Sequence, residues 1–385
     1  MRVSKLLGIG FHLLCTYSCI ESFHPEIKET QDQLVVSGNI SDQPGWHYVE
    51  VSRSSPFNDP HFIPVRGCVV RVEDENGQGI NYSEDQPGVY RADLDESFLG
   101  VNKAYKLYVY TQDGEEYQSD YDSLLACPPV DSLYYEIEKH ESEDTNVTYL
   151  GGIQFYVDVK GKAGDSRNFL WKLEETYEYR AAYLIQYFWD TDSVYEFDPP
   201  SDSLARCYKS GSISEIYTAS SRHLVANELN RYPLSFVSGK FPQLRFKYGL
   251  MVTQYSLSDE AFLYWENMRT LTYETGGMYE KQPASADGNI YNVNDPEEQV
   301  LGFFYASQER QKWIVLKRPF LMYILDFTCW LEIAVLDDLN EECFLVSVDL
   351  DGLGPPYGYG DQACFDCRLL DDGILEPPFY WTEDE

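Results

Sequence analysis

Short apolar runs separated by turn residues restrict the fold of this chain more than any other feature. In the run 65–73, Cys68, Val70 and Val72 recur at every second position, the period of a strand with one buried face. Asn76-Gly77 fits a tight hairpin turn. Short strands at this spacing predict an immunoglobulin-like sandwich over residues 34–129. The predicted strands are 34–40, 46–52, 65–73, 89–92, 103–111 and 116–119.

Residues 130–385 continue the strand pattern and predict a larger β-sheet or sandwich domain. Residues 183–195 are dense in aromatics and fit either a strand or a hairpin, and 198–203 reads as a loop. Residues 283–296 read as a loop because of their prolines and glycines. The predicted strands are 133–137, 153–159, 169–179, 213–219, 234–237, 244–255 and 300–306, with two more in 312–325.

One helix is predicted at about 258–275. Ser258 is a good N-cap, and Asp259 and Glu260 lie in the first turn, where negative charge is favoured. Phe262 and Trp265 follow helical spacing, as expected for a face that packs on a sheet. The predicted fold class is therefore all-β, that is, mainly β with one inserted helix.

The first eighteen residues have the pattern of a lipoprotein signal peptide. Arg2 and Lys5 precede a short apolar run over 6–14, which is too short to span a bilayer, since that takes about 20 apolar residues. Ser18 is followed by Cys19, the predicted lipidated first residue of the mature chain, and 19–33 is the predicted tether. The alternative is an ordinary cleaved signal that leaves Cys19 as a plain thiol. Cys15 is a weaker lipidation candidate, because bulky Leu14 precedes it.

The net charge excludes one class of partner. Acidic residues number 64 against 29 basic ones, a formal charge of −35 that becomes −37 when the signal takes Arg2 and Lys5. Such a surface repels nucleic acid, and it repels anionic headgroups, so attachment to a membrane must come from the lipid. The acidity fits either solubility alone or an acidic binding face.

Seven cysteines remain after the signal and the lipid site are set aside. An exported chain can form disulfides, and the odd number leaves at least one thiol unpaired. Cys364 and Cys367 are predicted to pair structurally, with each other or with Cys329 and Cys343. No histidine lies beside these cysteines, which argues against zinc, and no βαβ unit surrounds them, which argues against a redox centre. Cys68 is predicted to be a core residue.

No catalytic signature is present. The sequence holds no GxSxG, HExxH, P-loop or GxGxxG motif, so no catalytic residue, cofactor or metal is predicted. Residues 349–352 and 93–96 resemble the start of a calcium loop, but neither completes the twelve-residue pattern. Four Asp-Ser-aliphatic triplets match the acceptor used for O-glycosylation in some exported Bacteroidota proteins. Their serines are Ser123, Ser132, Ser193 and Ser203.

Several sequence blocks together resemble one family. They include 54–57, 87–90, 128–135, 206–208, 255–258, 288–293, 300–307 and the ending 364–368. The chain resembles the domain-of-unknown-function 4249 lipoproteins of Bacteroidota over nearly the whole mature length. One departure is that 369–372 replaces the glycines that usually follow the CxxC pair. The resemblance implies a lipid anchor in the outer membrane and a gene often beside a TonB-dependent receptor. The expected orientation is toward the cell surface, with the periplasmic face as the alternative. It brings no established activity.

The expected function is that of a non-enzymatic outer-membrane surface lipoprotein. It would act as an accessory subunit of a TonB-dependent outer-membrane transporter, by capturing substrate or capping the barrel. One alternative is an exported glycan-acting hydrolase that uses an acid pair in the aromatic region 177–197. Another is a structural or adhesive surface module. The ligand is not readable from the sequence.

Overall fold

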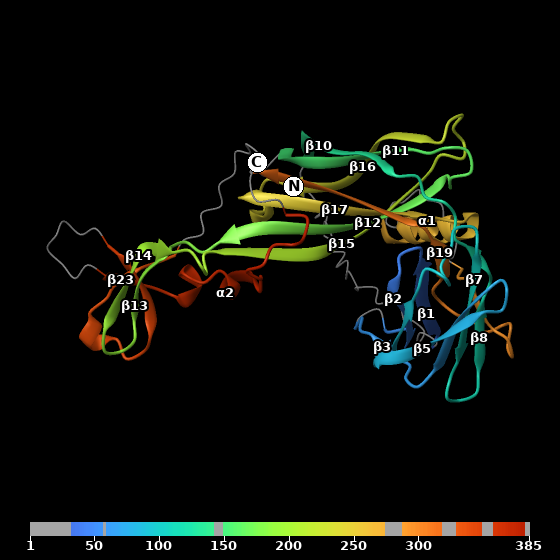
Figure 1. Cartoon of the computed structure of the whole chain (residues 1–385), viewed down its shortest axis with the longest axis horizontal. Coiled ribbons are helices and arrows are strands. Elements are labelled where there is room, and N and C mark those ends of the chain that lie inside the picture. The colour runs from blue at the N-terminus through green and yellow to red at the C-terminus, as the bar shows by residue number, and fades with distance from the viewer. Residues whose placement is uncertain are drawn as a thin grey trace, which may run out of the picture.

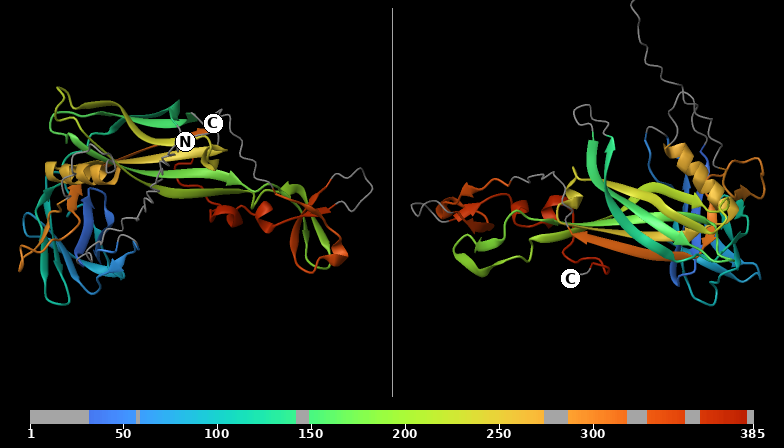
Figure 2. Two further views of the ribbon diagram at one scale, coloured as in Figure 1. Left: turned by 180° about the vertical axis from the view of Figure 1, so that it is seen from behind. Right: turned by 90° about the horizontal axis from the view of Figure 1, so that it is seen from above.

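The computed structural model describes residues 32–56, 59–141, 149–273, 287–317, 329–348 and 357–381. These residues form three β-rich parts in a row: an N-terminal sandwich, a central pair of sheets and a small distal lobe (Figures 1 and 2). The predicted all-β fold class is confirmed. Cys19, the signal peptide and nearly all of the tether lie outside the described residues. Within the described residues, no helix is long and apolar enough to cross a membrane.

The N-terminal sandwich is a single eleven-stranded sheet that bends into two layers. Its path runs β18-β8-β7-β4-β5-β6-β2-β1-β19, with β3 on β2 and β9 on β7. Strand β5 pairs with both β4 and β6, so it joins the two layers that enclose a single core. The strands are β1 (Leu34–Ser41), β2 (Gly45–Arg53), β3 (Ile63–Pro64), β4 (Val69–Asp74), β5 (Gly79–Gln86), β6 (Val89–Leu94), β7 (Ala104–Tyr110), β8 (Glu116–Ser119), β9 (Asp122–Ser123), β18 (Ile290–Asn292) and β19 (Phe304–Ser307).

The alternation of side chains in this sandwich follows the sequence pattern. Val70 and Val72 on β4 are fully buried, and Cys68 just before them is buried as predicted. The β4–β5 hairpin turns at Asn76-Gly77, where Gly77 has a φ of 81° and the Asp74 carboxylate accepts the Asn76 N–H at 2.9 Å. A glycine is favoured there because side chains with a Cβ rarely adopt a positive φ.

Two edge strands of the sandwich come from the second half of the chain. Strand β18 pairs antiparallel with β8, and β19 pairs parallel with β1. Gly302, which leads into β19, has a φ of 97°, and a Cβ there would collide with the Val36 carbonyl. The sandwich predicted for 34–129 thus also takes strands from 290–307, and the segment 283–296, predicted to be a loop, contains β18.

The central part packs two antiparallel sheets face to face. The first has the order β10-β11-β16 and the second β15-β12-β17-β20. Their shared core includes Phe155, Trp171 and Tyr248, and the Trp171 indole N–H donates to Gln254 Oε1 at 3.0 Å. The strands are β10 (Val130–Glu141), β11 (Tyr149–Lys160), β12 (Asn168–Arg180), β15 (Arg206–Ser220), β16 (Glu228–Ser238), β17 (Lys247–Ser256) and β20 (Glu309–Lys317), with the 3₁₀ turn η1 (Pro242–Leu244).

Helix α1 (Asp259–Tyr273) confirms the predicted helix. Ser258 Oγ accepts the Ala261 N–H at 3.1 Å, which satisfies one of the free N–H groups at the helix start. Phe262 and Trp265 pack with Leu170 of β12 and with Tyr305 of β19. The helix therefore wedges between the central sheet and the sandwich (Figure 1).

A buried polar seam joins the sandwich to the central part at Gln308, between β19 and β20. The Gln308 side chain accepts the Cys127 N–H at 2.9 Å and donates to Asp42 at 2.8 Å. Ser256 Oγ accepts the Gln308 N–H at 3.0 Å. Since buried polar groups are costly when unpaired, these bonds fix how the two parts meet.

Asp122 gives this region a pH dependence. Its carboxylate accepts the Ala306 N–H at 2.7 Å, and burial raises its pKa from 3.8 to about 6. Because the folded pKa exceeds the unfolded one, the folded state binds more protons between these values, and stability falls as pH rises through them. We expect the free energy of unfolding of the native chain to fall by about 2 kcal/mol relative to Asp122→Asn between pH 4 and 7. Urea unfolding of both proteins across that range measures the difference; parallel profiles would contradict it.

Candidate functional site

The distal lobe is built on a five-stranded sheet with two hydrophobic clusters of its own. Its sheet has the order β14-β13-β22-β23-β21. Residues 183–195, predicted as strand or hairpin, form most of the β13–β14 hairpin. The prediction of a loop over 198–203 is wrong for 198–201, because these residues lie in β14. The two prolines of β14 are tolerated because β14 is an edge strand. The elements are β13 (Ile185–Trp189), β14 (Val194–Ser201), β21 (Glu332–Ile333), η2 (Leu336–Asp338), β22 (Cys343–Ser347), β23 (Tyr357–Tyr359) and η3 (Gln362–Cys364).

Two disulfides fix the lobe and its junction. Cys329 pairs with Cys364 across the lobe, and Cys367 pairs with Cys207 of β15 in the central part. Of the two predicted alternatives, the pairing of Cys364 with Cys329 forms. Cys364 and Cys367 do not pair with each other, because the two side chains enter different cores. Nor is Cys343 in a disulfide; it remains a half-buried thiol, and burial raises its pKa. No sequence signal marked Cys207, which is 160 residues from its partner.

After the CxxC pair, the chain returns to the central part. Helix α2 (Arg368–Asp371) follows Cys367, and the Tyr177 hydroxyl donates to Asp371 at 2.7 Å. Tyr380 and Trp381 are buried near Tyr208 and Met251 of the four-stranded sheet. Phe379 beside them stays exposed. The C-terminal aromatic segment thus closes the outer face of the central sheet, and the distal lobe extends beyond it.

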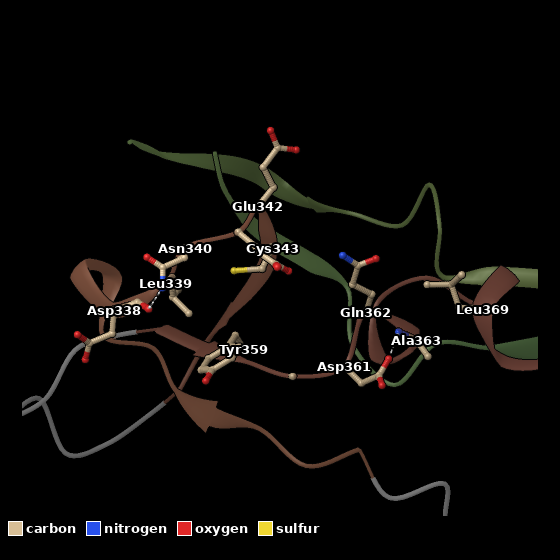
Figure 3. A pocket seen from close by; sticks show the side chains of 12 residues that line it. Asp338, Leu339, Asn340, Glu342, Cys343, Tyr359, Asp361, Gln362, Ala363 and Leu369 are labelled. Atoms are coloured by element: carbon tan, nitrogen blue, oxygen red, sulfur yellow. Dashed lines mark hydrogen bonds between the residues drawn. The ribbon is translucent and has the colours of Figure 1, made fainter. Parts of the chain in front are cut away.

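An open pocket lies on the lobe (Figure 3). Its volume is about 810 Å³, and it is lined from the 338–343 segment and from 359–363, with Leu369 at one side. Cys343 and Tyr359 lie near its centre, between Asn340 on one side and Gln362 on the other (Figure 3). The Tyr359 hydroxyl donates to Glu332 at 2.9 Å, which holds its ring in place.

The charge of the lobe is entirely of one sign. Its described residues, 182–205, 329–348 and 357–366, hold twelve carboxylates and no Lys, Arg or His. About a third of the chain's net charge of −35 therefore lies in this small part. The twelve are Asp190, Asp192, Glu196, Asp198, Asp202, Glu332, Asp337, Asp338, Glu341, Glu342, Asp361 and Asp366. This asymmetry was readable from the sequence and is the signal that could have located the lobe.

Large apolar side chains are exposed on the same lobe. Trp330 is 79% exposed, and the others lie between 40% and 52%. Apolar surface surrounded by polar groups is typical of binding sites, and Trp and Tyr are enriched at interfaces. The six residues are Leu184, Tyr195, Phe197, Trp330, Ile333 and Val335.

The arrangement suits binding. Among the described residues, no group of three or more His, Cys, Asp and Glu side chains is placed to hold a metal ion. The carboxylates of the pocket, Asp338, Glu341, Glu342 and Asp361, lie at its exposed rim, and none forms an ion pair with a described residue. The lobe therefore offers unpaired acceptors beside apolar surface.

The predicted modification sites are spread over the molecule. Ser193 and Ser203 are exposed on the distal lobe, in the β13–β14 turn and just after β14. Ser123 and Ser132 are half-buried in β9 and β10. Of these four serines, only Ser193 and Ser203 are exposed, as modification by a glycosylating enzyme would require. Residues 349–352, one of the two calcium-like patterns, lie outside the described residues.

Comparisons with known proteins identify a family but no characterised relative. No curated protein matches the chain. A solved structure of trypsin-activated alpha-2-macroglobulin from Escherichia coli matches with 10% identity and a TM-score of 0.20, covering 60% of this chain and 15% of its own. A biofilm-associated protein BSP domain matches with 6% identity and a TM-score of 0.13, covering 74% of this chain and 59% of its own. Neither likeness is close enough to support an argument. The model of a domain of unknown function, DUF4249, matches residues 20–313, and the chain belongs to that family.

Proposed function

We propose that this chain is a non-enzymatic, lipid-anchored lipoprotein of the bacterial outer-membrane surface. In this proposal it assists a TonB-dependent outer-membrane transporter by capturing substrate or capping the barrel, and the distal lobe makes the contact. The observation that carries the proposal is the exposure of six large apolar side chains on an acidic lobe at the end of the molecule opposite the sandwich (Figure 1).

The position of the lobe relative to the proposed anchor supports this. The chain enters the fold at β1 in the sandwich, and residues 20–33 join β1 to Cys19. Fourteen residues span at most about 50 Å when fully extended. An anchor at Cys19 would hold the sandwich near the bilayer and leave the lobe at the far end, free to reach a neighbouring protein.

Co-purification tests the proposal. Tagged native protein, isolated from detergent-solubilised membranes of a producing bacterium, is expected to bring down a TonB-dependent transporter. Trp330→Ala is expected to reduce the recovered transporter at least about fivefold, because large exposed aromatics carry much of the binding energy at interfaces. Recovery is measured by quantitative mass spectrometry of the eluate.

Phe379→Ala is the matched control. Phe379 is 78% exposed, close to the 79% of Trp330, but it lies on the C-terminal segment outside the lobe. It is expected to leave recovery unchanged. The same mass spectrometry reads the mature N-terminus, expected at an acylated Cys19. Recovery of no transporter from native membranes would overturn the accessory role, and an unacylated chain free in the medium would overturn the anchor.

A further inference from the structure

The distal lobe differs from the rest of the chain in how its charge is balanced. Elsewhere, some carboxylates pair with cations: Arg310 lies 3.3 Å from Asp42, and Lys209 bonds to Asp371. The described residues of the lobe include no Lys, Arg or His side chain that could pair with its carboxylates. Of these carboxylates, Asp366 forms an ion pair with Arg368 of α2, a residue just outside the lobe. A chain that needed charge for solubility alone would not have to concentrate it in this way.

The side chains around the pocket on the lobe favour a positively charged ligand. Asp361 accepts the Ala363 N–H through Oδ1 at 2.9 Å, which fixes its carboxylate at the rim and leaves Oδ2 available. Glu342, directly before β22, lies on another side of the opening (Figure 3). The Tyr359 ring lines the same pocket (Figure 3), and an aromatic ring favours a cation over its face.

The lining also accommodates an apolar stem. Leu339 and Leu369 contribute aliphatic surface, and the half-buried Cys343 side chain lies at the centre of the pocket. A bare metal ion would use neither the aliphatic surface nor the aromatic ring, since it prefers a shell of oxygen ligands. A lysine or arginine side chain uses both, because it buries its methylenes while its charged end reaches carboxylates.

We propose that this pocket receives a lysine or arginine side chain presented by a protein partner, with the exposed apolar residues of the lobe packing around it. The inference rests on the proposed function, because it names the chemistry of the partner face that the lobe contacts. It predicts that the partner surface is basic and that the contact weakens with salt.

Calorimetric titration of the full mature chain tests the pocket directly. The probe is a blocked tetralysine peptide, and its counterpart carries four Nε-acetyl-lysines. We expect the lysine peptide to bind at 20 mM salt, its affinity to fall at least about tenfold by 300 mM salt, and the acetylated peptide not to bind. Absence of binding by the lysine peptide, or equal binding of the two peptides, overturns the inference.

Matched variants separate the pocket from the overall charge. Glu342→Gln with Asp361→Asn removes two pocket charges and keeps the side-chain shapes. Glu96→Gln with Asp131→Asn removes the same charge from exposed positions on the sandwich and central part. The pocket pair is expected to weaken peptide binding about tenfold and the control pair less than twofold. Equal weakening by both pairs shows that only net charge matters and overturns the pocket.

Co-purification with the pocket pair distinguishes this inference from the proposed function. If native protein recovers the transporter and the pocket pair recovers as much at every salt concentration, the accessory role stands and the pocket inference fails. If native protein recovers no transporter but binds the lysine peptide in the pocket, the accessory role fails and the pocket chemistry stands.

Discussion

Replacing Cys207 and Cys367 together by serine is expected to lower the free energy of unfolding by about 5 kcal/mol. The disulfide closes a loop across 160 residues, and in the chain-entropy model a loop of that length restricts the unfolded chain by about this amount. Both cysteines are fully buried in the central core. The serine hydroxyls of the variant would therefore be buried away from water in the folded state, which lowers stability further. Guanidinium unfolding, followed by circular dichroism, measures the change.

Cys343→Ser is the control for this prediction. Cys343 is a half-buried free thiol of the distal lobe, and its replacement is expected to cost less than about 1 kcal/mol. Should the double variant fail to fold, a variant with Cys329→Ser and Cys364→Ser keeps Cys207–Cys367 as the one disulfide of the described residues, and comparison of its oxidised and reduced forms gives the same information. An unfolding midpoint that does not move on losing the Cys207–Cys367 bond would show that it adds nothing to stability.

Trp171→Ala is expected to cost about 3 to 5 kcal/mol. Trp171 is 1% exposed between the two central sheets, its ring lies 4.7 Å from that of Tyr232, and its N–H bonds to Gln254. The substitution removes buried apolar surface, opens a cavity and leaves the Gln254 oxygen without its donor. Urea unfolding, again followed by circular dichroism, reports the loss.

Trp330→Ala makes the same chemical change at a surface position. Trp330 is 79% exposed, so its loss is expected to change the free energy of unfolding by no more than about 0.5 kcal/mol. Comparison of Trp171→Ala with Trp330→Ala therefore separates the effect of burial from that of residue type. If Trp330→Ala leaves stability unchanged, a loss of transporter recovery by that variant is due to a lost contact and not to unfolding. Similar costs for the two variants would contradict this placement of the residues.

The strands visible in the sequence are those with one buried and one exposed face. On β2, His47, Val49 and Val51 are buried while Trp46 and Tyr48 are exposed, which is the period-two signal that predicted the strand. Strand β18 gave no such signal, because it has three residues and its partner β8 lies some 170 residues earlier. Pairing over that distance depends on the whole fold and leaves no local pattern.

The candidate site was predictable in composition but not in geometry. The absence of basic residues from 182–205 and 329–366 is a property of the sequence alone. That these two segments share one sheet follows from the pairing of β13 with β22, and the pattern of either strand does not encode it. The prolines of β14 were misread because proline is excluded from central strands and tolerated at an edge.

The parallel pairing of β1 with β19 constrains how this protein can be made. Every polypeptide is synthesised from its N-terminus, so β1 is available long before residues 304–307 have followed it. Until then its outer backbone groups have no partner, and an unpaired strand of this kind invites association with other chains. The β1 edge must therefore stay shielded until residues 304–307 have been made, and a fragment cut at residue 129 would keep that unpaired edge permanently.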